Sequence, residues 1–596
     1  PGAVWFPGAQ VNYAQQVLRH VDAAHAAGLP AIVSRNERGQ HHEMAWPELR
    51  QQVAALALHL QAQGVQPGDR VAAYLPNIPE TMVAFLAVAS IGGVWSLCAP
   101  DMGTAAVLDR FRQIEPKVLI ACDGVRYGGR DFDRAQVVAE LRAALPSVTH
   151  LLVHDNLGTL DSAIEMLAPC ARLVSALARN DAQTREFEPL WLPFDHPLWI
   201  VYSSGTTGLP KPIVHGHGGT VIVALALMGL HNDIGCSYLD NTRGERFHWY
   251  SSTGWVMWNC QVAGLLMGTT CCIYDGNPGG AKDQPDWTVL WRFAADLGVT
   301  FFGAGAAFFG NCMKAGVQLS RFPGLKTVRA LGTTGSPLSP DVQNWGTRQF
   351  RSIAALHSGE VSAAGRPQGA KAPSGDPHAV GERGGDIWWC NISGGTDFAG
   401  AFIGANRELP QTPGEMQCRL LGCAVEAWNE QGHPVVDEVG ELVCTQPIPS
   451  MPLYFWGDEG NQRLISSYFD TYPNVWRHGD WLKVTPSGSC IIYGRSDATI
   501  NRYGLRMGTS ELYSAVEALP EVLDSLVVDL EYLGRESYMP LFVVLRPGVG
   551  LNTALRNRIN EAIKTALSPR FVPNDIFQVA EIPRTLSGKK QELPIK

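Results

Sequence analysis

The sequence predicts an α/β protein with a large multi-layered N-terminal body and a small α+β domain at its C-terminal end. The first observation is length, because 596 residues exceed what one simple hydrophobic core organises. The second is that helix-like and strand-like patterns alternate along the chain as far as Leu331. The third is a change of pattern at Asp497, which predicts a boundary between residues 1–496 and 497–596.

The alternation starts with an amphipathic helix. Leu49, Val53, Leu56 and Leu60 recur at the spacing of one helix face, and Gly64 predicts the stop. The elements expected next are a strand at 70–75, a helix from about 79, a strand at 94–99, a helix at 103–113, and strands at 118–122 and 197–202. In the C-terminal domain we expect a helix at 509–518 and strands at 523–529 and 541–545.

Residues 81–100 carry no charge and are long enough for a membrane span. Gly92 and Gly93 divide the stretch into a helix-like and a strand-like half. We therefore expect a buried helix followed by a strand, and no membrane partner.

Residues 358–385 differ from the rest, because glycine, proline, alanine and serine dominate them without an apolar period. Such a segment buries too little surface to offset its ordering entropy. We expect a disordered surface insertion; a local error in the sequence is the alternative.

Composition limits the partners and the cellular compartment that the sequence predicts. Lys and Arg number 47 against 56 Asp and Glu, a formal charge of −9, which argues against a nucleic-acid partner. The 13 cysteines are scattered and no signal peptide precedes them, which indicates reduced thiols in the cytoplasm. Pro1 in place of Met, and an end soon after Lys589, lead us to expect trimmed termini. Oligomeric state is left open.

The strongest motif directly follows the expected strand at 197–202. Glycines expose backbone N–H groups, hydroxyls add donors and a lysine adds positive charge, which together suit a polyphosphate. Pro210 directly before the lysine excludes a Walker loop. The candidate phosphate-binding residues are Ser203, Ser204, Gly205, Thr206, Thr207, Gly208 and Lys211.

These residues resemble the phosphate loop of the adenylate-forming superfamily, which contains acyl-CoA synthetases, luciferases and adenylation domains. The other signatures of that superfamily follow in the expected order. They are Gly335-Ser336-Pro337, the segment 391–397 ending in Ser393-Gly394-Gly395-Thr396-Asp397, the segment 476–480, the segment 493–497 with 504–506, and the segment 583–589.

Within the superfamily the chain most resembles the acetoacetyl-CoA synthetases, through phrases such as WFPGAQVNYA, SSGTTGLPKPIVHGHGG, LGTTGSPLSP and TLSGKK. The resemblance fails only at about 344–385. It implies ATP-dependent ligation of acetoacetate to coenzyme A through an acyl-adenylate, with release of AMP and pyrophosphate. A sister ligase for acetate, propionate or butyrate, and a catalytically silent nucleotide-binding homologue, are the alternatives.

The resemblance and the chemistry together assign roles. Gly335, Ser336 and Pro337 would hold adenine, and Ser393 to Thr396 the nucleotide, with Asp397 as the Mg²⁺ ligand. Asp480, Arg495 and Arg506 would contact the ribose or the phosphates. Lys589 would be catalytic, although Lys590 beside it makes that assignment ambiguous by one residue. Asp497 would be the hinge of a mobile C-terminal domain, and Tyr503 and Gly504 would meet CoA.

Residue size suggests the acyl group. Relatives that use acetate carry a bulky tryptophan where this chain has Gly394, so the glycine is expected to open the pocket to a longer acid. Thr334 offers a hydroxyl to a ketone. Trp255, Val256 and Met257 are expected to line the same pocket, with ordinary core packing as the competing interpretation for Met257.

Overall fold

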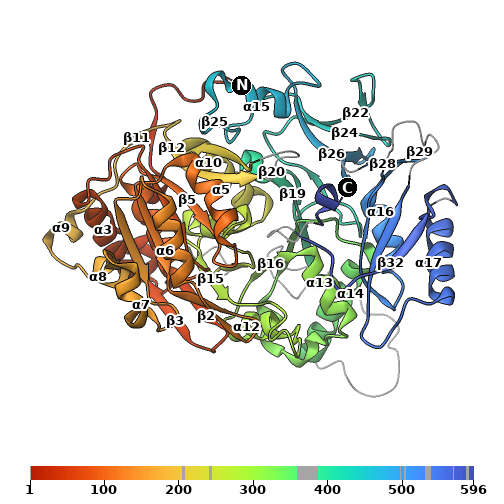
Figure 1. Ribbon diagram of the computed structural model, residues 1–596, viewed down its shortest axis with the longest axis horizontal. Helices are drawn as coiled ribbons and strands as arrows, with labels where there is room; N and C mark the ends of the chain where they lie inside the picture. The colour runs from red at the N-terminus through yellow and green to blue at the C-terminus, as the bar shows by residue number, and fades with distance from the viewer. Residues whose placement is uncertain are drawn as a thin grey trace.

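The computed structural model describes residues 2–203, 209–239, 244–358, 387–496, 499–502, 505–530, 538–567, 569–584 and 590–595 (Figure 1). Two predominantly parallel sheets organise the N-terminal body. In the described residues the first has eight strands in the order β10 (Ala171–Arg172), β9 (His150–His154), β6 (Val118–Cys122), β4 (Arg70–Tyr74), β5 (Val94–Cys98), β12 (Pro197–Ser203), β13 (Lys211–Gly216) and β25 (Tyr454–Phe455). Antiparallel pairing begins at β13.

The second sheet has seven strands within the same described ranges. Their order is β18 (Trp388–Asn391), β17 (Ala330–Thr334), β16 (Phe301–Gly305), β14 (Arg246–Trp249), β15 (Thr270–Asp275), β2 (Pro30–Asn36) and β3 (His41–Ala45). All neighbours are parallel except β2 and β3.

Alternating side chains give the body its layers. On β4, Val71 and Ala73 join the core between the two sheets, where α3 (Trp46–Ala62) and α4 (Pro79–Ser90) lie. Ala72 and Tyr74 point to the other face, which α5 (Thr104–Ile114), α6 (Ala135–Ala144) and α7 (Leu160–Leu167) cover. The outer face of the second sheet is covered by α12 (Val289–Asp296), α13 (Ala306–Lys314) and α14 (Pro340–Ser358).

Smaller sheets complete the body beside these layers. An antiparallel sheet contains β23 (Pro434–Val435), β22 (Val425–Trp428), β24 (Val439–Cys444), β26 (Trp476–Val484) and β27 (Cys490–Arg495). A second one contains β19 (Ser393–Gly395), β20 (Gly400–Gly404) and β21 (Cys418–Arg419). Helix α15 (Gln462–Tyr468) precedes β26.

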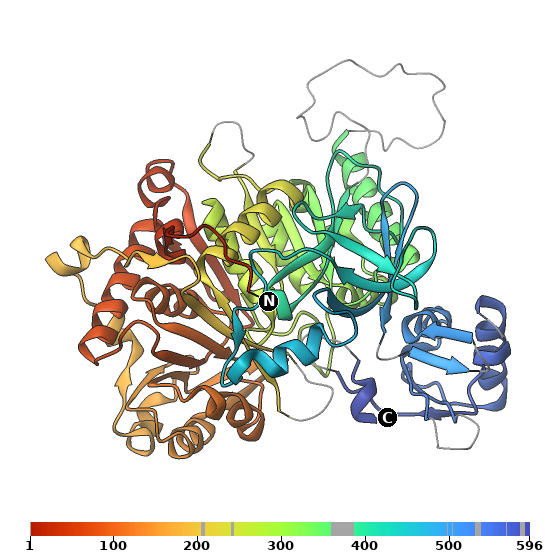
Figure 2. The ribbon, with the colours of Figure 1, turned by 90° about the horizontal axis from the view of Figure 1, so that it is seen from above.

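The C-terminal part stands to one side of the body (Figure 2). Helices α16 (Thr509–Glu517) and α17 (Thr553–Ala566) and strands β30 (Val522–Val527) and β31 (Pro540–Leu545) share one apolar core, and β32 (Asp575–Gln578) pairs with β31. Strands β28 (Thr499–Arg502) and β29 (Leu505–Gly508) form a hairpin. The boundary at residue 497 falls outside the described residues and stays a prediction.

The expected elements match the structure closely. The predicted stripe of α3 is wholly buried, and the strand predicted at 118–122 is β6. The uncharged stretch divides as expected into α4 and β5. No helix in the described part of the chain has the length and apolar character needed to cross a bilayer.

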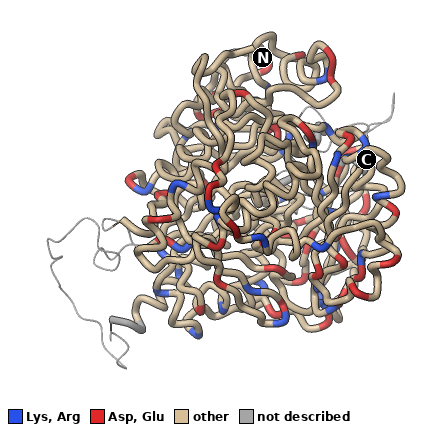
Figure 3. The backbone as a smooth tube through the Cα atoms, turned by 90° about the vertical axis from the view of Figure 1, so that its left-hand side faces the viewer, with Lys and Arg blue, Asp and Glu red and all other residues tan. Residues whose placement is uncertain are grey.

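Residues 344–358, the first part of the segment in which the sequence departs from its family, belong to a helix, and a strand follows the segment at Trp388–Asn391. Helix α14 runs to Ser358. Strand β18 pairs in parallel with β17, so the second sheet includes the strand that precedes the expected nucleotide segment. Residues 359–385 of the expected insertion lie outside the described residues. Positive and negative residues are interspersed over the chain (Figure 3).

Candidate active site

The predicted nucleotide residues gather at the carboxyl ends of parallel strands. Strands β16, β17 and β18 end in register, with Gly305 opposite Thr334 and Thr333 opposite Asn391. Residues 335–337 follow β17, and the segment 392–397 follows β18. In open α/β sheets this edge is where ligands bind.

Asp397 lies at the centre of the described site. It belongs to the short helix Thr396–Phe398, directly after β19. Its Oδ1 accepts hydrogen bonds from Ser203 Oγ at 3.1 Å and from the Tyr468 hydroxyl. The end of β12 and the end of α15, far apart in sequence, therefore hold one carboxylate.

The surroundings keep this carboxylate ionised. Burial raises the pKa of Asp397, but the Tyr468 hydrogen bond and the charges of His478, Lys211 and Arg495 outweigh it. The net result is a pKa below the ordinary value. Asp397 is thus a negatively charged oxygen ligand across the neutral range.

His215 on β13 fixes the backbone of Asp397. Trp199 Nε1 donates to His215 Nδ1 at 3.1 Å, so the ring proton is on Nε2, which lies 3.1 Å from the Asp397 carbonyl. Burial lowers the pKa of His215 to about 4, so the ring is neutral. His217 is also occupied, since its Nδ1 accepts from the Tyr13 backbone N–H at 3.0 Å. Neither histidine has a metal-binding arrangement, and the described residues contain no cluster of three metal-ligating side chains.

The two ends of the predicted phosphate loop lie beside Asp397. Ser203 and Lys211 face one another across the β12–β13 pair. The Lys211 ammonium lies 4.9 Å from the centre of the Tyr468 ring and 5.9 Å from that of Phe455. The loop residues between them, 204–208, are outside the described residues.

The predicted ribose residues are cross-strand neighbours. Asp480 on β26 is opposite Arg495 on β27, and Arg495 Nη1 lies 3.5 Å from Asp480 Oδ1. His478 Nε2 lies 3.5 Å from Asp480 Oδ2. Gly479 has φ +84°, and a Cβ there would lie 2.8 Å from Arg495 Nη2, so a side chain would displace the guanidinium.

This strand end joins the Asp397 segment through aromatic contacts. The rings of Phe398 and His478 meet edge to face at 5.5 Å. A Cβ on Gly395 would lie 2.9 Å from His478 Cε1. The predicted metal and ribose residues therefore belong to one site.

A narrow cavity adjoins the site. It is lined by two predicted substrate residues, Trp255 and Val256, and by the predicted nucleotide residue Thr396. Met257 instead packs in the core between the sheets, as the competing interpretation holds. Thr334 is partly buried at the end of β17, whereas Ser336 and Pro337 are exposed.

Gly394 differs from expectation. A Cβ at this position would lie 2.1 Å from the carbonyl oxygen of Gly400 and 2.8 Å from Ala401 Cα. The absent side chain thus faces the backbone of β20 and does not open the cavity. Close pairing of β19 with β20 accounts for the glycine.

Several predicted residues cannot be placed. Arg506 belongs to β29, but its side chain is outside what the structure describes. The remaining predicted residues outside the described residues are Ser204, Gly205, Thr206, Thr207, Gly208, Asp497, Tyr503, Gly504 and Lys589.

Sequence reasoning missed three supporting residues: Tyr468, His215 and Glu441. Glu441 on β24 accepts from the Gly479 backbone N–H at 3.0 Å and from Arg477 Nε at 3.0 Å, and so supports the ribose strand. Glu441 lies in no motif, so nothing in the sequence around it indicated this supporting role. His215 and His217 have a spacing that metal ligands can have, but no third ligand lies near them in the sequence, so the pattern predicts no site.

Known proteins are similar to this chain in sequence. The family model of the AMP-binding enzymes matches residues 19–359. An acetoacetyl-coenzyme A synthetase of Rhizobium meliloti is 39% identical over 598 aligned residues, covering 100% of this chain and 83% of the relative. The chain belongs to the acetoacetyl-CoA synthetase family. The mouse member of this family is 37% identical, over 99% of this chain and 82% of its own length.

Solved structures agree. The acetoacetyl-CoA synthetase of Streptomyces lividans is 46% identical, with a TM-score of 0.86 over 100% of this chain and 83% of that one. An anthranilate CoA ligase in complex with anthranoyl-AMP matches with a TM-score of 0.74 at 16% identity, over 98% of this chain and 96% of that one. The anthranilate CoA ligase shares the fold of this chain. The chain is therefore an adenylate-forming enzyme with an α/β architecture.

Proposed function

We propose that this acetoacetyl-CoA synthetase family member ligates acetoacetate to coenzyme A with ATP as the energy source. The observation that carries the proposal is the full-length similarity to proteins named for that activity. The grouping of Asp397, Asp480 and Arg495 at one edge of the fold supports an ATP site there.

In the first half-reaction a carboxylate oxygen of acetoacetate attacks the α-phosphorus of ATP. The bond to the β-phosphate breaks and pyrophosphate leaves, so negative charge grows on the phosphates. Lys211 and the N–H groups and hydroxyls of residues 203–208 would stabilise that charge. Asp480 would accept from the ribose hydroxyls and Arg495 would donate to the ribose or a phosphate.

The donor chemistry fits Mg²⁺. Asp397 is ionised, and Mg²⁺ is usually bound by one or two carboxylates together with substrate phosphates. Asp397 would hold the ion, with the Ser203 hydroxyl beside it. When bound, the ion would neutralise charge on the leaving pyrophosphate.

In the second half-reaction the thiol sulfur of CoA attacks the acyl carbon. The acyl–phosphate bond breaks, AMP leaves and the thiol proton passes to solvent. We propose Lys589 as the catalytic cation of the first step, Asp497 as the hinge between steps, and Tyr503 and Gly504 as CoA contacts. These roles are supported by the match of their motifs to the family.

Acyl choice is proposed to lie with Trp255 and Val256, which line the cavity beside Thr396. One methylene changes selectivity by only about 1–3 kcal/mol, so we expect a preference among short acids. The 13 cysteines, all in described residues, form no disulfide, which supports the proposed cytoplasmic location.

The test is product formation by purified protein with ATP, Mg²⁺, CoA and a panel of acetoacetate, acetate, propionate and butyrate. We expect acetoacetyl-CoA and AMP in equal amounts and fastest turnover with acetoacetate. Faster turnover with another acid would make the chain a sister ligase. ATP binding without turnover of any acid would make it a silent homologue.

A further inference from the structure

The chain on either side of the predicted catalytic lysine is fixed to one carboxylate. Gln591 N donates to the Pro583 carbonyl at 2.9 Å, and Arg584 forms an antiparallel bridge with Lys590. Residues 585–589 lie between these points and outside the described residues. Their two attachment points are therefore side by side.

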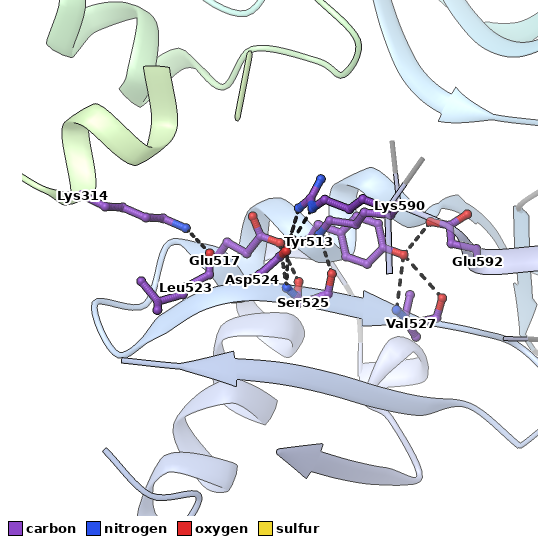
Figure 4. Close-up of polar contacts among 10 residues, drawn as sticks. Lys314, Tyr513, Glu517, Leu523, Asp524, Ser525, Val527, Lys590 and Glu592 are labelled. Atoms are coloured by element: carbon purple, nitrogen blue, oxygen red, sulfur yellow. Dashed lines mark hydrogen bonds and ion pairs between the residues drawn. The ribbon is translucent and has the colours of Figure 1, made fainter. Parts of the chain in front are cut away.

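Asp524 on β30 binds both flanking cations. Arg584 Nη2 lies 2.7 Å from each Asp524 oxygen, and Lys590 Nζ lies 3.1 Å from Asp524 Oδ1. Figure 4 shows Asp524, Glu517 and Lys590 converging. Burial raises the pKa of Asp524, but the charges of Lys590 and Arg584 outweigh it and leave the pKa below its ordinary value.

The ammonium of Lys590 is fully engaged within the C-terminal part. It pairs with Glu517 Oε1 at 2.5 Å, donates to the Ser525 carbonyl and lies 3.6 Å from the centre of the Tyr513 ring (Figure 4). A lysine has three N–H donors, and Glu517, Ser525 and Asp524 account for three acceptors. Its side chain is only 13% exposed.

Lys590 therefore cannot reach a substrate without breaking this set of contacts. Of the two adjacent lysines, Lys590 is thus committed to contacts within the protein. Consecutive Cα atoms are about 3.8 Å apart, so fixing Lys590 fixes the point from which Lys589 extends.

The cluster also lies where the two parts of the chain meet. Lys314 at the end of α13 donates to the Leu523 carbonyl at 2.6 Å, next to Asp524 (Figure 4). Arg546 Nη2 donates to the Lys314 carbonyl at 3.3 Å. Asp524, which binds Arg584 and Lys590, thus lies next to a contact between the C-terminal part and the body.

We propose that Lys590, held by Asp524 and Glu517, is a positioning residue that sets the place of Lys589 for adenylation. This rests on the proposed function. Misplacement of a reacting group by 1 Å can cost about 10²-fold in rate. Loss of the Lys590 charge should therefore slow adenylation while sparing the thioester step, in which Lys589 has no proposed role.

The test compares Lys590→Met and Asp524→Asn with wild type in the two half-reactions. We expect acetoacetate-dependent pyrophosphate–ATP exchange to fall about 100-fold in kcat. Conversion of purified acetoacetyl-adenylate with CoA should stay within about threefold of wild type, because misplacement affects the step that uses Lys589. Lys590→Arg, which keeps the charge, should restore most of the exchange.

Two controls separate positioning from stability and from direct catalysis. Lys564→Met removes a lysine–glutamate pair on the exposed face of α17 and should change neither half-reaction. The double variant Lys589→Ala/Lys590→Met should be no slower than Lys589→Ala alone, because both act through one group.

Unchanged exchange in Lys590→Met, an equal fall in both half-reactions, or a further large loss in the double variant would overturn the proposal. Absence of acid-dependent exchange in wild type would instead count against the proposed function.

Discussion

Tyr468 shows how one residue of the site depends on distant chain segments. Its hydroxyl donates to Asp397, and its ring stacks on Trp476 with centres 3.7 Å apart. Burial and the nearby Asp397 carboxylate raise the pKa of Tyr468, so its hydroxyl remains a donor. The hydroxyl orients the carboxylate, and the ring holds the hydroxyl in place.

Tyr468→Phe should therefore weaken adenylation and also lower the free energy of unfolding, by about 1.5–3 kcal/mol for a hydrogen bond to a charged group. The same interaction energy lost from the transition state would lower kcat/KM for MgATP by roughly 10–150-fold. Pyrophosphate exchange and thermal unfolding measure the two effects.

Tyr538→Phe is the matched control, because its hydroxyl donates to the exposed Asp575 at 2.8 Å. Equal activity in the two variants would contradict a role for the Tyr468 hydroxyl.

Among elements, the two ends of the strands in the second sheet differ: predicted site residues lie at the carboxyl ends, and a buried ion pair that stabilises the fold lies at the amino ends. The predicted nucleotide residues lie at the carboxyl ends of β17 and β18. At the amino ends, buried Glu245 accepts from Arg329 Nε at 2.8 Å and from the Thr300 hydroxyl at 2.5 Å. Arg329 is 2% exposed, so this ion pair connects β14, β16 and β17 without solvent.

Glu245→Gln should destabilise the protein without changing substrate binding. Removing one partner of a buried ion pair costs up to about 3–5 kcal/mol, and because Arg329 keeps its contact with Asp233 at 3.4 Å we expect a loss toward the lower end of that range. Urea unfolding should show this loss, while the KM for ATP stays within about twofold because the pair is at the opposite sheet end. Glu188→Gln, which removes an exposed pair with Arg50, should cost less than about 1 kcal/mol. Similar losses in both variants would contradict this division.

At the scale of the whole molecule, buried neutral histidines make stability depend on pH. Burial lowers the pKa of His215 and of His248 to about 4 and that of His217 to about 3, against 6.5 for the unfolded chain. Between these values the unfolded state binds more protons. Stability from these residues is therefore fully present above pH 6.5 and is lost as pH falls toward the folded pKa values.

Urea unfolding between pH 6.5 and 5.0 should show this loss. Each histidine contributes up to about 1.4 kcal/mol per pH unit. Replacing the exposed His25 by Gln should leave the slope unchanged, whereas His248→Gln should reduce it. A flat free energy of unfolding over this range would contradict the assignment.

Local sequence patterns were sufficient to predict the helices and strands, and to predict which residues within the motifs lie close together. The alternation of apolar residues predicts β6 and α3, and motif order predicts that Asp480 and Arg495 act together, as their pairing across β26 and β27 allows. Residues that act across the fold leave no such pattern. Tyr468 and Glu441 matter through contacts that exist only after distant strands and helices pack.

Gly394 shows that a residue within a motif can also be misinterpreted from the sequence. Its size suggested an open pocket, but the backbone of β20 occupies the space that a side chain would need. A glycine's purpose depends on the neighbouring strand, which the sequence around it does not specify.

The most direct test of adenylate formation at this site is acetoacetate-dependent exchange of labelled pyrophosphate into ATP, without CoA, in wild type and in Asp397→Asn. This reaction requires reversible formation of an acyl-adenylate at the site described. We expect exchange that is fastest with acetoacetate and falls by about 10²–10³-fold in Asp397→Asn. No acid-dependent exchange in wild type, or undiminished exchange in Asp397→Asn, would contradict adenylate formation at this site.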